Sequence, residues 1–415
     1  MTSQIKDPQL APQGEQKIAW VRQHMGLLNA IRARFESEKP FEGVRVGLSI
    51  HLEAKTAYLA QVLSSGGAQV AITGSNTLSF QDDVAAALAA SGEISVFGRH
   101  GATPEEYQHD LAAVLASKPQ VILDDGGDLT QLLHNERPEL ADHLWGSTEE
   151  TTTGVRRLQA SAAAGLLAFP AFAVNDAQMK HLFDNRYGTG QSTWDAIMRT
   201  TNLVIAGKTV VVGGYGWCGR GVAMRAHGLG AKVIVTEVDP VRAIEALMDG
   251  YRVMTMREAA PQGDIFVSTT GCRDVIGAEA LAKMKDGALL ANAGHFDVEI
   301  NIGDLRALAD EHHEIRRNIE AFQLKDGRRL YLLAQGRLVN LAAGDGHPVE
   351  IMDLSFAIQA LTLEYITKHY RELQPGLYPV PPEIDRQVAE MKLQTLGLAI
   401  DRLSPEQQTY LANQA

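Results

Sequence analysis

The sequence predicts an α/β protein with two doubly wound units and a helical C-terminal segment. Apolar, strand-like runs alternate with helical patterns along most of the chain, which is typical of mostly parallel sheets covered by helices on both faces. A glycine-rich loop near the middle of the chain directly follows one of these runs. With 415 residues, of which 45% are hydrophobic and 21% charged, the chain can form two or three domains around large cores.

The first unit extends from about residue 43 to residue 176. Its expected helices cover 54–66, 82–91, 104–117 and 151–166, and its expected strands are Val44–Ile50, Ala68–Thr73, Ile94–Phe97, Val121–Leu123 and Ala171–Val174. Polar residues follow four of these strands, namely His51, Ser75 and Asn76, Asp124 and Asp125, and Asn175 and Asp176. Because ligands bind beyond the carboxyl ends of parallel strands, we expect a binding cleft there.

The second unit covers about residues 191–345, and the helical segment follows it. The unit begins with a helix over Ser192–Thr201, and its expected strands are Thr209–Val212, Lys232–Thr236, Ile265–Ser268, Ala288–Asn292 and Arg329–Leu333. Helical patterns then cover about 350–370 and 382–415, and the proline-rich stretch Pro375–Pro382 is interpreted as a linker between them.

The glycine-rich loop is Gly214-x-Gly216-x-x-Gly219, and a helical segment, Val222–Leu229, follows it. In a Rossmann-like unit the first glycine permits a tight turn, the second lets a pyrophosphate approach the backbone, and the third allows close helix–strand packing. The helix N-terminus supplies free N–H groups for the phosphates. Glu237 ends the next strand about 20 residues downstream, where an acid accepts hydrogen bonds from the adenosine ribose. The loop therefore predicts a dinucleotide site.

Glu237 favours NAD over NADP, since its charge would repel a 2′-phosphate. Arg220 and Arg242 keep NADP open as an alternative, because a nearby arginine can accept the extra phosphate. A glycine-rich structural turn without a cofactor is the other alternative.

The composition argues against nucleic acid, membrane and metal partners. The formal net charge is −12, and the chain has no block of lysine and arginine. No run approaches the ~18 apolar residues that span a bilayer, and the N-terminus lacks the apolar stretch of a signal peptide. Cys218 and Cys272 show no metal-ligand spacing and are interpreted as reduced thiols of a cytoplasmic protein.

Two acidic segments are candidates for chemistry. Asp124-Asp125-Gly-Gly-Asp128 places three carboxylates at a strand end, where we assign function to Asp125 and a helix cap to Asp128. Thr148–Gly154 contains two carboxylates and three consecutive threonines, and we expect it to open a helix. Its residues suit either a helix N-terminus or hydrogen bonds to a ligand.

Basic residues form two further candidates. Lys180 and Asp184 share one helix face at i,i+4 spacing, beside Asn185, and an exposed ion pair would explain this pattern as well as a site would. Three histidines follow strand-like or glycine-rich segments, where they could transfer protons: His51, His295 and His347.

These motifs resemble the S-adenosylhomocysteine hydrolase family over nearly the whole chain. The matching residues are Asp124–Thr130, Glu149–Val155, Asn175-Asp176 with Lys180 and Phe183–Asn185, the glycine loop with Thr236–Pro240, Thr269–Cys272, Asn292–Glu299, Gly336–Leu341 and Gly346–Pro348. The resemblance implies reversible hydrolysis of S-adenosyl-L-homocysteine to adenosine and L-homocysteine. It implies bound NAD⁺, which takes a hydride from C3′, so that the C4′ proton becomes acidic and homocysteine leaves C5′ before the hydride returns.

The resemblance also implies a division of the chain and a role for each matching residue. The substrate domain is expected over 1–190, completed by about 346–390, the NAD-binding domain over 191–345 and a C-terminal helical tail over 391–415. Lys180 is expected to accept the 3′-hydroxyl proton with the help of a depressed pKa, while Asp184 and Glu150 hold the ribose hydroxyls. Asp125 is a candidate base at C4′, and Asn185 lies beside the nicotinamide.

The histidines take two kinds of role in this comparison. His51 and His295 are expected to activate water and protonate the leaving thiolate, and His347 to lie at a gate between the domains. The implied NAD contacts are Thr151, Thr152, Thr153, Asn185, Gly214, Gly216, Trp217, Cys218, Gly219, Arg220, Gly221, Glu237, Arg242, Thr270, Ala293, Gly294, His295, Asn340 and His347.

Three departures from the family pattern concern the cofactor. Thr189 replaces the family's cysteine near the nicotinamide, and Arg242 replaces an asparagine at the adenosine ribose. The family's long C-terminal tail, which reaches the NAD site of a neighbouring subunit, is expected to be missing. A homo-oligomer, either a dimer or a tetramer, is still expected.

A fourth departure concerns the purine. Many family members have Met-Thr-x-Glu-Thr after the first histidine, with the glutamate facing the purine, whereas this chain has Leu52-Glu53-Ala54-Lys55-Thr56. A lysine donor suits the 6-oxygen of hypoxanthine, so S-inosyl-L-homocysteine is an alternative substrate. The other interpretation leaves Lys55 on the helix surface and lets Glu53 accept from the 6-amino group of adenine. Glu53, Lys55 and Thr56 are the expected contacts at this end.

Two other classes of function remain as alternatives. One is a dehydrogenase that releases NADH, and the other is a non-catalytic NAD-binding regulator. Both are less favoured, because the chain retains Lys180, Asp184, His51 and His295 and no long polar extension precedes its first unit.

Overall fold

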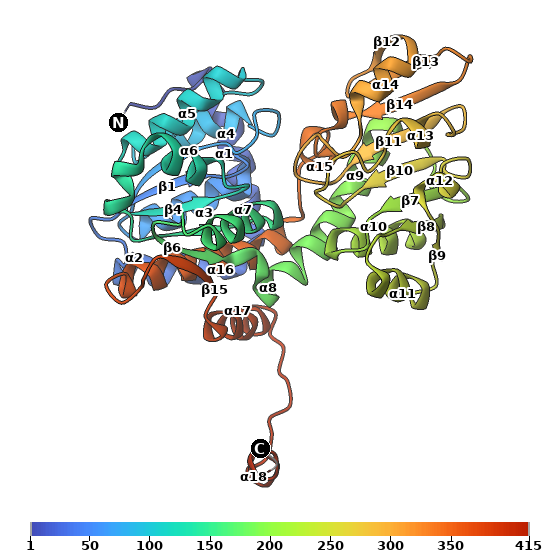
Figure 1. Cartoon of the computed structure of the whole chain (residues 1–415). Coiled ribbons are helices and arrows are strands. Elements are labelled where there is room, and N and C mark those ends of the chain that lie inside the picture. The colour runs from blue at the N-terminus through green and yellow to red at the C-terminus, as the bar shows by residue number, and fades with distance from the viewer. Residues whose placement is uncertain (1, 414–415) are drawn as a thin grey trace.

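The computed structural model describes residues 2–413, which form two α/β lobes side by side (Figure 1). The first lobe is built on a seven-stranded sheet and the second on an eight-stranded sheet. Helices cover both faces of each sheet, and the chain ends in helices. The predicted fold class is confirmed.

The sheet of the first lobe is parallel throughout, in the order β15-β6-β5-β4-β1-β2-β3. Its strands are β1 (Arg45–Ser49), β2 (Gln69–Thr73), β3 (Ile94–Phe97), β4 (Val121–Asp124), β5 (Gly146–Glu149), β6 (Pro170–Ala173) and β15 (Gly376–Pro379). The chain proceeds from β1 outward to β3 and then returns to start again at β4. The direction therefore reverses between β1 and β4, and a crevice opens at their carboxyl ends.

Two strands of this sheet differ from the prediction. Gly146–Glu149 is a buried strand, whereas we expected Thr148–Gly154 to open a helix, which begins only at Thr152. A strand buried on both faces has no polar alternation that would identify it. Gly376–Pro379, predicted as a linker, pairs with β6 at the edge of the sheet, where proline is tolerated.

Helices form a layer on each face of the first sheet. One layer contains α1 (Ala11–His24), α2 (Gly26–Glu38), α3 (Ala54–Ser65), α4 (Asp82–Ala90), α16 (Val349–His369) and α17 (Pro382–Thr395), and the other contains α5 (Pro104–Ala116), α6 (Asp128–Glu136) and α7 (Thr152–Ala163). Alternate residues of β2 serve the two layers, since Val70 and Ile72 belong to one core and Ala71 to the other. Helices α1 and α2 are not among the predicted elements.

The sheet of the second lobe has the order β12-β13-β14-β11-β10-β7-β8-β9. Its strands are β7 (Thr209–Gly213), β8 (Lys232–Thr236), β9 (Arg252–Val253), β10 (Ile265–Ser268), β11 (Ala288–Asn292), β12 (Ala309–Arg316), β13 (Ile319–Leu324) and β14 (Arg329–Leu333). The five predicted strands are confirmed. The prediction misses β9, β12 and β13, of which β12 and β13 form an antiparallel extension. Strand β12 is largely exposed and has no apolar run.

Helices also cover both faces of the second sheet. One layer contains α9 (Thr189–Thr201), α10 (Trp217–Gly228), α11 (Pro240–Met248) and α15 (Val339–Ala342), and the other contains α12 (Met256–Ala259), α13 (Ala278–Leu281) and α14 (Ile302–Leu308). Helix α10 begins five residues before the predicted Val222, directly after Gly216 of the glycine loop. Its N-terminus therefore lies where phosphates would bind.

The chain passes from the first lobe to the second and back again. It leaves through α8 (Gln178–His181) and a π-helical turn, Asp184–Gly188, and it returns after α15 to form α16 in the first lobe. The predicted tail helix over 382–415 is two helices, α17 and α18 (Pro405–Ala412), and residues 414–415 of that prediction lie outside the described residues. Figure 1 shows α18 apart from both lobes, and none of its residues is buried. No helix within residues 2–413 has the length and apolar character needed to cross a bilayer.

Candidate active site

A cavity of about 750 Å³ is lined by residues of both lobes. The predicted site residues that line it are His51, Glu53, Lys55, Thr56, Asp125, Glu150, Thr151, Thr152, Thr153, Lys180, Asp184, Asn185, Gly214, Gly216, Trp217, Cys218, Glu237, Arg242, Thr270, Ala293, Gly294, His295, Asn340 and His347. The structure thus brings together all of the predicted catalytic and substrate-binding residues.

Sheet topology explains why residues so distant in sequence meet here. His51 and Asp125 follow β1 and β4, the two strands at the switch point of the first sheet. Gly214 and Thr270 follow β7 and β10, the corresponding strands of the second sheet. The two crevices open into the same cavity, as expected for ligands bound beyond the carboxyl ends of parallel strands.

Lys180 lies at the centre of a buried polar cluster. Its Nζ donates to Asn185 Oδ1 at 2.9 Å and to Asn175 Oδ1 at 3.3 Å. Two carboxylates complete the cluster, with Asp184 Oδ2 at 3.2 Å and Glu150 Oε1 at 3.5 Å from the same nitrogen. All five side chains are buried. The alternative interpretation of Lys180 and Asp184 as an exposed ion pair is therefore wrong.

The charge state of this cluster differs from the prediction. Burial alone would lower the pKa of Lys180, but the charges of Asp184 and Glu150 outweigh it and raise that pKa above the ordinary lysine value. The expected depressed pKa is therefore wrong for this arrangement, and Lys180 is an ammonium ion. Burial raises the pKa of Glu150 to about 8, against the opposing charge of Lys180. For Asp184, Lys180 and His347 outweigh burial and hold the pKa well below its usual range.

Helix α16 supplies hydrogen-bond donors for both carboxylates, and neither donor is among the predicted site residues. Ser355 Oγ donates to Asp184 Oδ2 at 2.9 Å, and Gln359 Nε2 donates to Glu150 Oε2 at 2.5 Å. Ser355 and Gln359 are one helical turn apart and fully buried. Two polar residues at i,i+4 in an otherwise apolar helix are the pattern that could have identified them. Two further α16 side chains line the cavity, Met352 and Phe356.

His51, Asp125 and His295 form a second group in the cavity. Each offers one nitrogen or oxygen atom, and these atoms lie within 4.8 Å of one another. Ser79 Oγ donates to Asn76 O at 3.0 Å and lies 2.7 Å from His51 Nδ1, so it accepts a hydrogen bond from Nδ1–H. This leaves His51 Nε2 as the basic nitrogen, 3.5 Å from Asp125 Oδ2. Burial lowers the pKa of both histidines, although Asp125 opposes it, so both are neutral near pH 7.

Lys55 is at another end of the cavity, beside Glu53 at the N-terminus of α3. Its Nζ lies 2.7 Å from Glu53 Oε2 and donates to Asp345 O at 3.0 Å. Only 5% of Lys55 is exposed, so the interpretation that left it on the helix surface is wrong. Glu53 also accepts from the backbone N–H groups of Lys55 and Thr56, which fixes its carboxylate as the helix cap.

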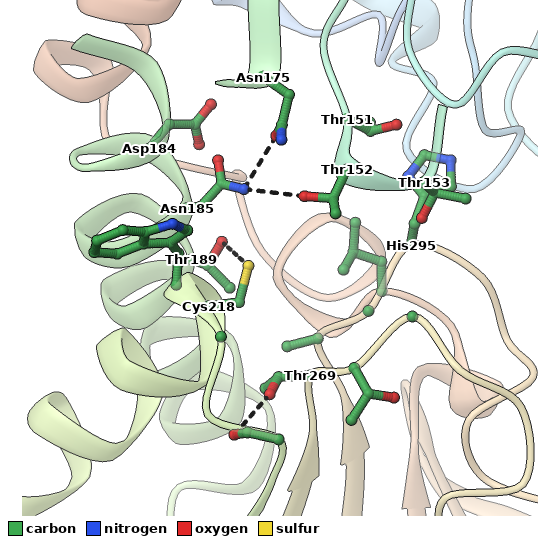
Figure 2. Close-up of a pocket in the computed structure, with 18 of the residues that line it drawn as sticks. Thr151, Thr152, Thr153, Asn175, Asp184, Asn185, Thr189, Cys218, Thr269 and His295 are labelled. Carbon is green, nitrogen blue, oxygen red and sulfur yellow. Dashed lines mark hydrogen bonds between the residues drawn. The ribbon is translucent and has the colours of Figure 1, made fainter. Parts of the chain in front are cut away.

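His347 connects the Lys180 cluster to the glycine loop. Its Nδ1 contacts Asp184 Oδ1, and its Nε2 lies 3.3 Å from Thr189 Oγ1. The Thr189 hydroxyl in turn lies 3.6 Å from Cys218 Sγ, at the start of α10 (Figure 2). His347 thus stands at the junction of the lobes, where a gate residue was expected.

The glycine loop has the geometry of a phosphate site. Gly214 has a φ of +98°, which favours glycine, and a Cβ added at Gly216 would meet only Arg242 Nη1, at 3.6 Å. Open space at Gly216 lets a ligand approach the backbone. Glu237 Oε2 accepts from Tyr215 N at 2.7 Å, so the strand-end acid is fixed against the loop.

The cavity lining also contains amide side chains, those of Asn340 and Asn185. Asn340 Nδ2 donates to Ser192 Oγ at 2.9 Å, while Asn340 Oδ1 is buried and has no partner among the described residues. Asn185 Nδ2 donates to Asn175 Oδ1 at 3.1 Å and to Thr152 Oγ1 at 3.5 Å (Figure 2). A nicotinamide carboxamide could donate to Asn340 Oδ1. The residues present therefore fit NAD at both ends.

Three predicted cofactor contacts do not line the cavity, and the structure gives them packing roles. A Cβ at Gly219 would lie 2.1 Å from a backbone oxygen of the glycine loop, and a Cβ at Gly221 would lie 1.7 Å from Arg186 O. Both glycines therefore permit close packing of α10. Arg220 pairs with Glu245 instead of facing the cavity.

Comparison with known proteins agrees with this geometry. Residues 185–346 match the family described as S-adenosyl-L-homocysteine hydrolase, NAD binding domain, and residues 2–142 match the family described as S-adenosyl-L-homocysteine hydrolase. The chain is similar to the S-inosyl-L-homocysteine hydrolase of Methanopyrus kandleri, with 55% identity over 408 residues covering 98% of this chain and 96% of the relative. It is also similar to the adenosylhomocysteinase of Pyrococcus abyssi, with 57% identity over 407 residues covering 98% and 96%.

Solved structures that resemble the chain include the A chain of dipicolinate synthase from Bacillus subtilis. The identity is 13% and the TM-score 0.45, over 80% of this chain and 97% of that one. The family assignment rests on the two matched families and on relatives that are 55–57% identical over 98% of this chain. The chain belongs to the S-adenosyl-L-homocysteine hydrolase family, as an enzyme with an NAD-binding domain.

Proposed function

We propose that this enzyme uses bound NAD to hydrolyse S-adenosyl-L-homocysteine reversibly to adenosine and L-homocysteine. The observation that carries the proposal is a single cavity with three parts: the Lys180 cluster, a cradle that fits NAD, and the group of His51, Asp125 and His295. An ordinary dehydrogenase needs only the first two parts. Breaking a carbon–sulfur bond also requires groups that transfer protons, and His51, Asp125 and His295 are such groups.

The Lys180 cluster acts at the ribose. Bound NAD⁺ supplies a hydride acceptor for C3′ and a hydride donor when the cycle closes. Glu150 and Asp184 bind the ribose hydroxyls, and the Lys180 ammonium donates a hydrogen bond to the 3′-oxygen. Because Lys180 and His347 keep Asp184 ionised, Asp184 only accepts a hydrogen bond. Glu150, whose pKa burial raises to about 8, accepts the 3′-hydroxyl proton while the Lys180 ammonium stabilises the 3′-oxygen.

The second group moves the remaining protons. Asp125 takes the C4′ proton once C3′ is a ketone, and the neutral histidines relay that proton to the homocysteine sulfur as the bond from C5′ breaks. Water then adds to C5′, and its proton returns through the same group to C4′. His51 fits this relay because Ser79 leaves its Nε2 free to accept a proton.

Thiol release tests the proposal. The purified protein with its bound cofactor, given S-adenosyl-L-homocysteine, should release one homocysteine thiol for each adenosine without accumulating reduced nicotinamide. Steady accumulation of NADH without thiol release would show an ordinary dehydrogenase instead. Binding of NAD with neither product would identify a non-catalytic relative.

S-inosyl-L-homocysteine is the second candidate substrate, and Lys55 is the observation that favours it. Its buried Nζ lies in the cavity lining, where an ammonium can donate to the 6-oxygen of hypoxanthine. Glu53, which can accept from the 6-amino group of adenine, lies against Lys55, so both purines have a partner. Comparing kcat/KM for the two nucleosyl homocysteines decides between them, since a hundredfold preference for the adenosyl form would end the inosyl alternative.

We further propose that the chain works as a homo-oligomer in the cytoplasm. The segment after α17 exposes six large apolar side chains, which suit a contact with a second copy: Leu396, Leu398, Ile400, Leu403, Tyr410 and Leu411. An exposed apolar face of α11 is a candidate surface for this segment, with Val241, Ile244, Leu247 and Met248. The free cysteines Cys218 and Cys272 suit a reducing compartment.

The division into domains follows the same assignment. We propose a substrate domain over 1–190, completed by about 346–390, and an NAD domain over 191–345, because the first sheet carries the Lys180 cluster and the second carries the glycine loop. The remaining segment, 391–415, is the proposed tail.

A further inference from the structure

Arg157 lies on α7 where the two lobes meet beside the turn that carries Asp125. Its Nη1 donates to Gly126 O and to Asp128 Oδ1, each at 2.7 Å. Its guanidinium also lies over the ring of Phe296 in the second lobe, 4.9 Å from the ring centroid. Arg157 is not among the predicted site residues and does not line the cavity.

The turn that Arg157 contacts is held on two sides. Gly126 has a φ of +106°, its N–H donates to Glu149 Oε1 at 2.9 Å, and its C=O accepts from Arg157. Both peptide groups of Gly126 are therefore fixed. Since Asp125 directly precedes this glycine, the same two contacts help to place its carboxylate, which also accepts a hydrogen bond from Ser75 Oγ at 3.2 Å.

The residues that Arg157 meets across the junction belong to the loop of His295. The rings of His295 and Phe296 pack edge to face, with centroids 4.6 Å apart. A Cβ added at Gly126 would lie 2.4 Å from His295 Nε2. The two loops are thus so close that only glycine fits between Asp125 and His295.

We infer that Arg157 is a positioning residue. Its contacts with Gly126 and Phe296 form a latch, which joins the two lobes and keeps Asp125 and His295 at their working distance. It acts through Gly126 and Phe296 and does not touch the substrate. A guanidinium suits this task, because it can donate to oxygens in its plane while its face stacks on an aromatic ring, which an ammonium cannot do. Asp128 does not depend on Arg157 alone, since Tyr107 Oη donates to Asp128 Oδ2 at 3.1 Å.

The inference rests on the proposed function and extends it to the closed state of the enzyme. While C3′ is a ketone, closed lobes keep the intermediate in place and exclude water. Without the latch, the keto nucleoside can leave before the hydride returns to C3′. Each such event leaves one reduced cofactor on the protein and one oxidised nucleoside in solution, so no other oxidant is needed.

The test compares Arg157→Met with Arg157→Lys and a matched control. Arg137→Met is the control, because Arg137 lies in the same lobe and pairs with Glu139 on the surface. Each holoprotein is assayed for kcat, KM, melting temperature and the absorbance of reduced nicotinamide during turnover. Arg157→Met should lose about 10- to 100-fold in kcat with little change in KM, as expected when reacting groups are misplaced. Arg157→Lys should recover little of this loss, and reduced cofactor should accumulate in both.

Two further measurements distinguish positioning from a structural role. Guanidinium ions should partly restore kcat to Arg157→Ala, whereas equal ammonium should not. In the double variant Arg157→Met with Phe296→Leu, the loss in kcat should be smaller than the product of the two single losses, because the two changes break one shared contact.

The outcomes separate the latch from the proposed function. If the unaltered enzyme releases no homocysteine, the proposed function fails. If it does, and Arg157→Met matches Arg137→Met in kcat and in reduced cofactor, the latch is wrong. The latch would also be wrong if kcat falls only in variants whose melting temperature falls as well, and if guanidinium ions do not restore kcat.

Discussion

The protonation state of Lys180 depends on its surroundings as well as on its residue type. The sequence places a lysine near Asp184, but the pKa of that lysine also depends on burial and on Glu150, which directly follows β5. Two carboxylates around one ammonium hold the proton on nitrogen, against the effect of burial. At this scale the residue types were predictable, whereas the protonation states required the three-dimensional arrangement.

Replacing Lys180 should affect both activity and stability. Lys180→Met should lower kcat by about 10²- to 10³-fold, the range for loss of one preorganised donor to a developing negative charge. It should also destabilise the fold by about 3–5 kcal/mol, because removing one partner leaves Asp184 buried without its countercharge. Steady-state kinetics and denaturant unfolding measure the two effects. The double change Lys180→Met with Asp184→Asn is the control, and it should regain stability without activity; recovery of turnover would contradict the assigned roles.

Glu149 gives a pH-dependent prediction. Burial, reinforced by the charge of Asp124, raises its pKa well above the ordinary value, so the folded protein keeps a proton that the unfolded chain loses. Stability therefore falls as pH rises from the ordinary glutamate range, by about 1.4 kcal/mol for each unit between the folded and unfolded pKa values. Glu149→Gln cannot ionise, so its melting temperature should rise relative to that of the unaltered protein as the pH increases from the ordinary glutamate range, about pH 4, through neutral pH. Glu136→Gln, at an exposed site, is the matched control, and a difference that does not change with pH would refute the neutral state of Glu149.

At the scale of elements, the strand ends were predictable and the helix behind them was not. The polar residues after β1, β4 and β6 marked the cleft because parallel strands bring their carboxyl ends together. Strand β5 was misassigned because its four buried residues show no alternation. Helix α16 is buried nearly all round, so it has no apolar stripe that would tell which side faces the site. Ser355 and Gln359 were missed for that reason.

The contacts of α16 with the two carboxylates can be tested one at a time. A hydrogen bond to a charged group contributes about 1.5–3 kcal/mol, so Ser355→Ala should lower kcat/KM by about 10- to 100-fold. Gln359→Leu should also lower kcat/KM, since Glu150 Oε2 loses its donor. Thr362→Val is the control on the same helix, because the buried Thr362 hydroxyl has no partner among the described residues. Equal kinetics for Ser355→Ala and Thr362→Val would show that α16 does not position the site.

At the scale of the whole molecule, the site exists only because two sheets face each other. His295, Asn340 and the glycine loop come from the second lobe, while Asp125, Glu150 and Lys180 come from the first. The family resemblance indicated this arrangement in advance. The contacts that hold it, such as Arg157 over Phe296, depend on side-chain positions across the junction and have no sequence motif.

The exposed segment after α17 gives a prediction about assembly. A chain that ends at Thr395 should lose the proposed oligomer, because the six apolar side chains beyond it no longer cover a neighbouring copy. Sedimentation velocity on the full chain and on the shortened chain measures the mass of each. Ile400→Glu with Leu403→Glu in the full chain is a milder form of the same test. If all three proteins contain the same number of subunits, the interface lies elsewhere.

Hydrolysis in heavy water tests the central claim most directly. If C3′ becomes a ketone and the C4′ proton is removed before homocysteine leaves, the released nucleoside should carry deuterium at C4′. It should keep its original hydrogen at C3′, because that hydrogen leaves and returns within one closed site. Mass spectrometry and NMR of the nucleoside locate the label. A nucleoside released with no deuterium at C4′ would contradict the account, since it would mean that the carbon–sulfur bond is cleaved directly.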